Sequence, residues 1–384
     1  MGFMGYGRSD GGVGVRNHVL VMSSVSCANA VVNGIARELP DIKAVTHSEG
    51  CGRGPADLAM TARTLTGLGK NPNVAAVLLV GLGCEFITSE YLMKEIGTSG
   101  KPVEAITIQG AGGSQKCMRK GIEIGRRLLA YAGSSARAEF DWANLTLGLE
   151  CGGSDSMSGV TANPMVGVAA DWIVSEGGTA IISETTEMIG TEKLLSQRGA
   201  TDEVSKKIVD LIAKQRKLAE ETLGPFADLT ISPGNIEGGL SSIQEKSLGC
   251  IIKGGTSPIR EILDYGDRVT KKGLAIMDTP GSDIFSVTGM VAGGAQIIVF
   301  TTGRGTPVGF PIAPVIKIAS NSELFQMMSE DMDINAGRIL EGESIEEAGA
   351  ELIDLVKRVA NGDMTKAEIN RQDVVSIHTV GPAF

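Results

Sequence analysis

The sequence has few aromatic residues, no long apolar run and no paired-cysteine motif, and each absence excludes a class of protein. Aromatic residues make up 4% of the chain, and no basic stripe is interleaved with them, which argues against nucleic-acid binding. No apolar run approaches the length of a membrane span, and residues 1–9 contain no signal-peptide core. We therefore expect a cytoplasmic protein that contacts neither nucleic acid nor membrane.

The six cysteines form no Cys-x-x-Cys pair. In a reducing compartment this spacing argues against disulfide bonds. The chain has 384 residues, of which 42% are hydrophobic and 21% charged, as expected of a well-packed protein with two domains. Its net charge of −10 means that an anionic substrate would need locally positive groups.

Apolar strands alternate with helical segments along the chain, and this alternation predicts an α/β fold with parallel sheets. Strands are expected at 18–23, 42–46, 74–81, 103–108, 145–149, 179–183, 274–277, 296–300, 315–318 and 374–378. Helices are expected at 28–38, 55–68, 114–131, 166–174, 203–223 and 345–359, the last with a capping box at Ser344 and Glu347. A polar linker at 136–143 would separate a domain at 1–135 from one at 144–384.

The glycine-rich stretch 150–164 follows one of the predicted strands. Ligands bind at the carboxyl ends of strands in open α/β sheets, and Ser154, Asp155 and Asn163 supply donors and acceptors there. Asn163 is also expected to cap the helix that follows. A glycine-rich turn with unusual dihedral angles is the alternative, but such a turn does not need so many polar groups.

Four cysteines follow predicted strands directly, and the carboxyl ends of parallel strands lie on one edge. A single cysteine is most simply a small buried hydrophobe, but four at equivalent places indicate a metal or active-site role. Those cysteines and their polar neighbours are Cys27, Cys51, Cys84, Cys151, His47, Glu49 and Glu85. Cys117 and Cys250 lie within helical patterns and are expected to be structural.

Polar clusters also follow strands in the second half. Glu184 and Glu187 follow the strand at 179–183, and Arg304 stands between two glycines, where it can grip a carboxylate with two hydrogen bonds. The loop with Asn235 precedes a helix, which is weak evidence for anion binding. No Gly-x-Gly-x-x-Gly joins a strand to a helix, so a nucleotide-dependent oxidoreductase is not supported.

With these motifs the chain resembles the altronate and galactarate dehydratases, a family of sugar-acid hydro-lyases, over nearly its whole length. The resemblance is carried by Asp10-Gly-x-Val-Gly-x-Arg16-Asn17, Gly50-Cys51-Gly52, Gly83-Cys84-Glu85, Cys151-Gly-Gly-Ser-Asp155, Ser158-Gly-Val-Thr-Ala-Asn-Pro164, Ser183-Glu184-Thr-Thr-Glu187, Pro233-Gly-Asn235, Phe300-Thr-Thr-Gly-Arg304-Gly-Thr-Pro307 and Met332-Asp333-Ile-Asn-Ala-Gly-Arg338.

This resemblance implies a dimerisation domain at 1–135, hence a homodimer, and a Rossmann-like variant at 144–384 that binds no nucleotide. Single-chain members of the family also carry an N-terminal β-clip domain, so a separately encoded small subunit, or a diverged two-domain enzyme, is implied. A related branch of the family releases bisulfite from (2R)-sulfolactate. That branch does not keep the Gly-Cys pairs after the second and third strands, so the cysteines here favour the dehydratases.

The resemblance also implies a metal-dependent dehydration of a small anionic sugar acid to a 2-keto-3-deoxy acid. Glu184 or Glu187 would be the acid/base, with Asp155 and Asp283 in reserve. The expected substrate contacts are Lys253 and Arg304 on carboxylates, Arg16 and Arg338 at the far end, and Ser154, Asn163 and Asn235.

The expected metal ligands are His47, Glu49, Cys51, Cys84, Glu85 and Cys151. Mixed nitrogen, oxygen and sulfur donors favour Fe²⁺; Mn²⁺ is an alternative, and three or more converging thiolates would instead hold an iron–sulfur cluster. A non-catalytic carboxylate-binding subunit stays open as a rival, although it would need neither the cysteines nor the paired glutamates.

Overall fold

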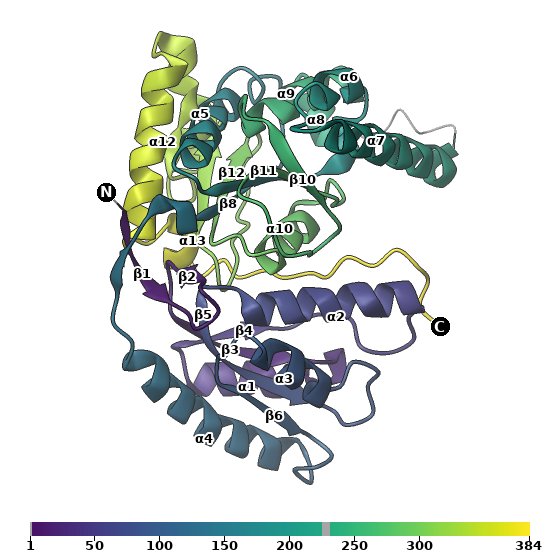
Figure 1. The fold of residues 1–384 in the computed structure, drawn as a ribbon, viewed down its shortest axis with the longest axis vertical. Helices are drawn as coiled ribbons and strands as arrows, with labels where there is room; N and C mark the ends of the chain where they lie inside the picture. The colour runs from purple at the N-terminus through teal and green to yellow at the C-terminus, as the bar shows by residue number, and fades with distance from the viewer. Residues whose placement is uncertain (1, 225–230) are drawn as a thin grey trace.

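The computed structural model describes residues 2–224 and 231–384, which form two parallel α/β sheets and one small antiparallel sheet (Figure 1). The predicted α/β class is confirmed. The larger sheet consists of β8 (Thr146–Cys151), β9 (Thr179–Ile182), β10 (Ile259–Leu263), β11 (Gly273–Met277), β12 (Ile297–Thr302), β13 (Val315–Ala319) and β14 (Ile334–Asn335). No helix among the described residues is long and apolar enough to cross a bilayer.

The strand order of the larger sheet is β10-β11-β9-β8-β12-β13-β14, and every pair in it is parallel. After β8 the chain adds β9 beside it, then β10 at the edge of the sheet, and then β11 between β9 and β10. It continues on the other side of β8 with β12, β13 and β14. The order therefore reverses between β8 and β12. In doubly wound sheets a crevice opens at such a reversal, outside the carboxyl ends of the strands.

The smaller parallel sheet has the order β4-β3-β5-β6. Its strands are β3 (His18–Ser23), β4 (Ile42–Val45), β5 (Val74–Gly81) and β6 (Val103–Thr107). All eight residues of β5 are buried, in agreement with its continuous apolar run, because both faces of a parallel sheet are covered. The four predicted strands of this half are confirmed.

The predicted linker 136–143 contains a strand, β7 (Ala138–Phe140), which pairs antiparallel with β1 (Phe3–Gly7). A short strand, β2 (Val13–Gly14), completes this third sheet. The linker is thus tied down by the start of the chain. Phe3 also stacks on Trp142 with ring centroids 5.3 Å apart. The sequence alone hides this pairing, because β1 and β7 are short and far apart in the chain.

Helices cover both parallel sheets, and six of them match the predictions to within four residues at each end: α1 (Asn29–Glu38), α2 (Pro55–Lys70), α4 (Ser114–Gly133), α5 (Ala162–Ser175), α7 (Asp202–Leu223) and α12 (Ile345–Ala360). The capping box at Ser344 and Glu347 is confirmed. The others are α3 (Ser89–Gly97), α6 (Glu192–Ser196), α8 (Pro233–Glu237), α9 (Ile243–Ile251), α10 (Asp283–Ala292), α11 (Ser322–Met327) and α13 (Lys366–Ile369). Helix α2 packs against α10, in the layer between the two parallel sheets (Figure 1).

Two buried asparagines join the sheets at this layer. The Asn71 Nδ2 group donates to the carbonyls of Val291 and Ala295, at 2.8 and 2.9 Å. Asn73 Nδ2 donates to the Gln296 carbonyl at 2.8 Å. Neither asparagine side chain reaches solvent, so these hydrogen bonds replace water contacts that both sides would otherwise lose.

Two local predictions are wrong. Residues 374–378 form no strand; they run as an extended segment towards α2, and the Val380 and Gly381 amides donate to the Asp57 carboxylate at 2.8 Å. Asn163 does not cap α5, whose N-cap is Thr161 without a side-chain cap. Asn163 lies inside the helix, because its side chain points to the sheet edge described next.

Candidate functional site

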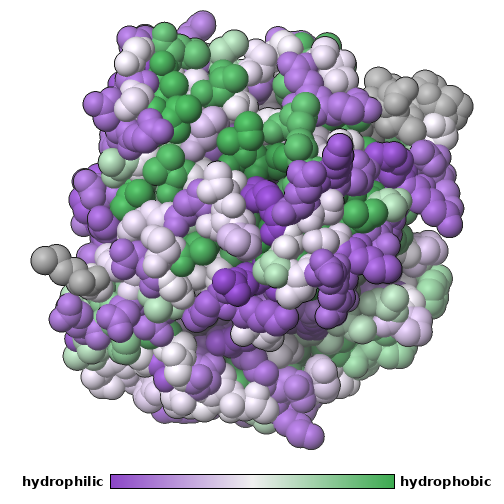
Figure 2. Space-filling view, turned by 45° about the horizontal axis from the view of Figure 1, so that its top comes forward, coloured by the Kyte–Doolittle hydropathy of each residue, from purple (hydrophilic) through white to green (hydrophobic). Residues whose placement is uncertain are grey.

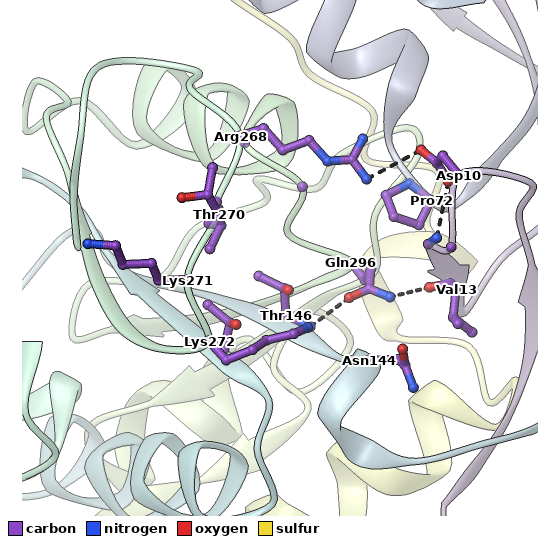
Figure 3. Close-up of a pocket in the computed structure, with 16 residues that line it drawn as sticks. Asp10, Val13, Pro72, Asn144, Thr146, Arg268, Thr270, Lys271, Lys272 and Gln296 are labelled. Atoms are coloured by element: carbon purple, nitrogen blue, oxygen red, sulfur yellow. Dashed lines mark hydrogen bonds and ion pairs between the residues drawn. The ribbon is translucent and has the colours of Figure 1, made fainter. Parts of the chain in front are cut away.

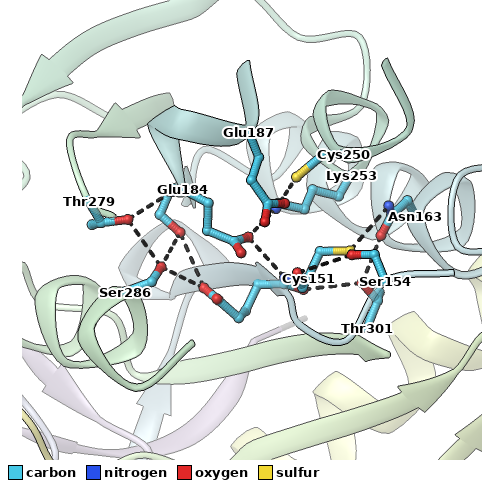
Figure 4. Close-up of polar contacts among 12 residues, drawn as sticks. Cys151, Ser154, Asn163, Glu184, Glu187, Cys250, Lys253, Thr279, Ser286 and Thr301 are labelled. Carbon is cyan, nitrogen blue, oxygen red and sulfur yellow. Dashed lines mark hydrogen bonds and ion pairs between the residues drawn. The ribbon is translucent and has the colours of Figure 1, made fainter. Parts of the chain in front are cut away.

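The carboxyl ends of β8, β9 and β12 bring a buried polar cluster together at the chain reversal (Figure 4). Strand β8 ends in Glu150 and Cys151, and the turn after β9 carries Ser183 and Glu184. The side chains of Glu150 and Glu184 are fully buried. Buried carboxylates are costly unless they are paired or hydrogen-bonded, so their partners define the site.

Glu184 has a left-handed backbone, with φ 63° and ψ 55°. A non-glycine residue in this region costs about 1–3 kcal/mol and marks a site where the surroundings fix the conformation. The Glu184 amide donates to Thr279 Oγ1 at 2.8 Å. The carboxylate is thereby directed to the end of β8, where Oε2 accepts from the Cys151 amide at 3.0 Å.

Two lysines pair with the glutamates that follow β9. Lys253 Nζ lies 2.5 Å from Glu184 Oε2 and 2.8 Å from Cys250 Sγ. Lys246 forms an ion pair with Glu187. Helix α9 and the turn after it carry both lysines and Cys250, and Figure 4 shows Lys253 and Cys250 together beside Glu184 and Glu187. The cluster therefore consists of carboxylates, ammonium groups and thiols in contact with one another inside the protein.

The environment moves the pKa values of these groups apart. Burial, together with the charge of Glu184, raises the pKa of Glu187 to about 8. The hydrogen bond from Cys250 lowers the pKa of Cys151 to about 5. Burial and then Glu184 raise the pKa of Asp283 to about 6. A proton donor and an ionised thiol thus lie side by side near neutral pH, as in sites for acid–base catalysis.

Cys151 has a polar surrounding of its own. Its sulfur lies 2.9 Å from Ser154 Oγ and accepts from Asn163 Nδ2 at 3.5 Å. Asn163 Oδ1 accepts from Thr301 Oγ1 of β12 at 2.7 Å. Ser154 and Asn163 were predicted to contact substrate; in the structure they hold the sulfur in place.

A cavity opens on this cluster from solvent, and we call it the edge cavity. It is lined by Cys151, Gly152, Gly153, Thr186, Glu187, Ser232, Asn235, Lys246, Gly281 and Asp283. Asn235 is fixed by its amide contact with the Ser154 carbonyl at 2.9 Å and by Lys246 at 3.2 Å. A small polar molecule in this cavity would meet an acid, a thiol and an ammonium group.

Three carboxylate oxygens in the cluster have no hydrogen-bond partner: Glu150 Oε1, Glu184 Oε1 and Glu187 Oε2. Among the described residues, two groups of three offer ligand atoms within 4.8 Å of one another, and they are Glu184, Glu187 and Cys250, and Glu150, Glu184 and Asp283. Buried, unpaired carboxylate oxygens of this kind fit a divalent cation.

The other predicted metal ligands belong to the smaller sheet. His47 Nε2 lies 2.8 Å from the Ser23 carbonyl, and Glu49 forms an ion pair with Arg53 at 2.8 Å. Glu85 accepts from the Ser24 hydroxyl and from two amides. These donors are used by the protein itself, and Cys27, Cys51 and Cys84 are exposed. Cys151 lies on the larger sheet, so the six predicted ligands do not share one sheet edge.

Several predicted substrate contacts have structural partners. Arg16 is buried, and its guanidinium pairs with Glu368 and donates to backbone carbonyls. Asp155 accepts from the Ser158 amide and hydroxyl at 2.7 Å and from the Ser320 hydroxyl at 2.9 Å. These contacts fix the turn after β8 rather than leave the carboxylate free.

The two remaining arginines are half-exposed. Arg304 pairs with Glu237 at 2.9 Å and lines a separate hollow with Asp155. Arg338 pairs with Glu343 and Glu351. Neither lines the edge cavity.

Sequence reasoning missed Glu150, Cys250 and Lys246. Glu150 is a charged residue near the end of an otherwise apolar strand, directly before a polar turn. This position could have indicated a functional side chain. Cys250 and Lys253 are three residues apart, a spacing that brings side chains together on one helical face. Cys250 was instead expected to be structural.

A second hollow lies at the opposite, amino ends of the strands (Figure 3). Lys271, Lys272 and Arg268 line it, and Arg268 pairs with Asp10 at 3.4 Å. Gln296 also lines this hollow, and its Oε1 accepts a hydrogen bond from the Thr146 amide at 2.6 Å. Ligands of doubly wound sheets bind at the carboxyl edge, so the edge cavity is the candidate active site.

A doubly wound sheet that carries an acid, a thiol and lysines where its strand order reverses is typical of an α/β enzyme. The family model described as "D-galactarate/Altronate dehydratase, C-terminal" matches residues 142–383, and that described as "D-galactarate dehydratase/Altronate hydrolase, second domain" matches 5–133. The chain belongs to the galactarate/altronate dehydratase family. It is thus a lyase of the carbon–oxygen class.

Similar proteins span almost the whole chain. Altronate dehydratase of Bacillus subtilis (strain 168) is 34% identical over 379 residues, covering 96% of this chain and 76% of that protein. Galactarate dehydratase (L-threo-forming) of Escherichia coli (strain K12) is 37% identical, covering 94% and 73%. The (2R)-sulfolactate sulfo-lyase subunit beta of Chromohalobacter salexigens is 35% identical, covering 95% and 94%.

Proposed function

We propose that this protein dehydrates a sugar acid of the altronate or galactarate type. A base removes the proton next to the substrate carboxylate, the β-hydroxyl leaves as water, and the enol becomes a 2-keto-3-deoxy acid. The proposal rests on one observation above all: Glu187 and Cys151, with pKa values of about 8 and 5, line the same cavity. At neutral pH one can give a proton while the other can take one.

The roles follow from position. Lys246 lines the cavity and can bind the substrate carboxylate as a point charge. Glu187, whose carboxyl group lies next to Lys246, would protonate the leaving hydroxyl in its protonated form. Cys151, fixed by Ser154 and Asn163, would take the α-proton. Lys253 is too deeply buried to reach a substrate, so it would stabilise Glu184 instead.

A divalent cation belongs to this proposal, since the family resemblance implies one and the free carboxylate oxygens fit it. A bound cation would act as a Lewis acid on the substrate carboxylate and so stabilise the negative charge that develops on it. The protein's own residues would bind, orient and move protons around it.

The sulfo-lyase alternative has a specific observation in its favour. The sulfolactate sulfo-lyase subunit beta is 35% identical to this chain, within the range of 34–37% found for the dehydratases. In that reaction bisulfite would leave from the β-carbon in place of hydroxide, and the same base would take the α-proton.

A small partner subunit is part of the proposal, because that relative is named as one subunit of an enzyme. Exposed apolar side chains lie beside the site: Val160, Leu248 and Ile252 line a cavity that also contains Cys151. Figure 2 shows apolar residues gathered in the upper part of this face of the molecule. A partner seated there would close the site to water. The homodimer stays a prediction.

The test is a substrate screen on anaerobically purified protein supplied in turn with Fe²⁺, Mn²⁺ and Mg²⁺. Aldonic and aldaric acids are assayed for 2-keto-3-deoxy acid, and sulfolactate is assayed for bisulfite. Keto-acid formation that Cys151→Ser and Glu187→Gln abolish supports the proposal. Bisulfite and pyruvate from sulfolactate, with no 2-keto-3-deoxy acid from any sugar acid, support the sulfo-lyase. Neither product, with any metal, points to the non-catalytic subunit.

A further inference from the structure

Glu150 and Glu184 each have one anchored and one free carboxylate oxygen. Glu150 Oε2 accepts from Ser286 Oγ at 2.6 Å and from Ser183 Oγ at 3.3 Å, whereas its Oε1 has no partner. Glu184 Oε2 is held by the Cys151 amide and by Lys253, and its Oε1 is likewise free. Both side chains have no solvent exposure, so bulk solvent does not reach the free oxygens.

Asp283 brings a third carboxylate to the same place, from the first residue of α10. Its ligand oxygen lies within 4.8 Å of those of Glu150 and Glu184. Gly152 allows this approach, because a Cβ there would lie 2.3 Å from an Asp283 carboxylate oxygen. Asp283 also lines the edge cavity, so the group of three is reached from solvent on one side.

Three carboxylates this close repel one another and are costly to bury. Every member of the alternative group of Glu184, Glu187 and Cys250 has an ammonium partner, since Lys253 lies 2.5 Å from Glu184 and 2.8 Å from Cys250 and Lys246 pairs with Glu187. Among the described residues, Glu150 and Asp283 form no ion pair. In the smaller sheet the carboxylates of Glu49 and Glu85 have protein partners. Of the three unpaired carboxylate oxygens at this sheet edge, two belong to the group of Glu150, Glu184 and Asp283, and the third is Glu187 Oε2.

We propose that Glu150, Glu184 and Asp283 bind one hard divalent cation, of the Mg²⁺ or Mn²⁺ class, at the inner end of the edge cavity. An all-oxygen, carboxylate-rich set suits such cations better than soft metals. The serine and amide contacts fix the ligands from behind, as outer-shell partners do in metal sites. This inference deepens the proposed dehydration by locating its cation, and it replaces the mixed-donor set from which Fe²⁺ was expected.

The test is Mn²⁺ binding to the full chain after removal of metals with a chelator. Free Mn²⁺ is counted by electron paramagnetic resonance, without any assay of activity. We expect one Mn²⁺ per chain. Asp283→Asn and Glu150→Gln should each weaken binding by about 10–100-fold or more, since even outer-shell changes cost that much.

Two matched controls complete the experiment. Glu85→Gln changes a buried carboxylate of the smaller sheet, and Glu187→Gln changes the alternative group; both should bind Mn²⁺ like the wild type. Loss of binding in either control, or wild-type binding by Asp283→Asn, would overturn the proposal. Circular dichroism shows whether Glu150→Gln folds, and if it does not, Asp283→Asn decides, because that side chain lies at the cavity wall. Mn²⁺ binding without turnover of any sugar acid would reject the proposed function and leave the cation site standing.

Discussion

The buried ion pair of Lys253 and Glu184 makes a quantitative prediction. Their atoms lie 2.5 Å apart, and the side chains are 1% and 0% exposed. At an effective dielectric constant of about 20, Coulomb's law gives an attraction of roughly 7 kcal/mol at this distance. Most of it offsets the cost of burying both charges. Removal of one partner, which leaves the other charge buried, costs about 3–5 kcal/mol of unfolding free energy.

The perturbation is Lys253→Met, which keeps the length of the side chain and removes the charge. Urea unfolding is followed by far-UV circular dichroism for this variant and for Lys206→Met, which breaks an exposed pair with Asp210. The control should lose less than about 1 kcal/mol. The double variant Lys253→Met/Glu184→Gln should recover part of the loss, because it removes the unpaired charge as well.

The result that would refute this reasoning is a Lys253→Met variant no less stable than Lys206→Met. It would mean that Glu184 is neutral in the folded protein or that another cation neutralises it. Repeating the unfolding with and without Mn²⁺ separates these two causes, since only the second depends on the metal.

Three further predictions concern single side chains. Glu187→Gln should lower kcat by about 10²–10⁴-fold. The wild-type kcat/KM should fall as pH rises through about 8, because a proton donor with a pKa of about 8 is ionised above that pH. A flat kcat/KM profile from pH 6 to 10 would exclude Glu187 as the proton donor. Asp155→Asn should cost about 1–3 kcal/mol of stability, since it weakens charged hydrogen bonds to Ser158 and Ser320, measured by urea unfolding; an unchanged midpoint would contradict the structural role. Arg304→Met should alter stability by less than about 1 kcal/mol, because its pair with Glu237 is exposed, so a raised KM in this variant would report a substrate contact that the edge cavity does not explain.

The sequence predicts most of the scaffold, because hydrophobic periodicity is a local property. The strand at 74–81 and the helix with the Ser344 capping box were both recovered from their own residues. The third sheet was missed because β1 and β7 pair across more than a hundred residues. The segment 374–378 was called a strand from its apolar content, yet it has no neighbouring strand along which to form a ladder.

The sequence indicates where part of the candidate cluster lies, but not all of the residues that form it. Cys151, Glu184 and Glu187 were placed at strand ends, and the structure brings them together. The convergence of Cys51 and Cys84 with Cys151 required all these strands to share one sheet, and no local pattern reveals that they belong to two. Cys250 was missed for the converse reason: a helical residue reaches the site only through tertiary packing.

The asparagines that join the two sheets have a consequence for how the enzyme opens. Their carboxamides carry no charge at any pH, and their carbonyl partners are equally indifferent to salt. The two halves are therefore joined in part by contacts that pH and salt leave unchanged, beside ion pairs such as those of Arg16 with Glu368 and Arg268 with Asp10. These uncharged contacts predict that the halves stay together during turnover, so crosslinking them should leave catalysis intact.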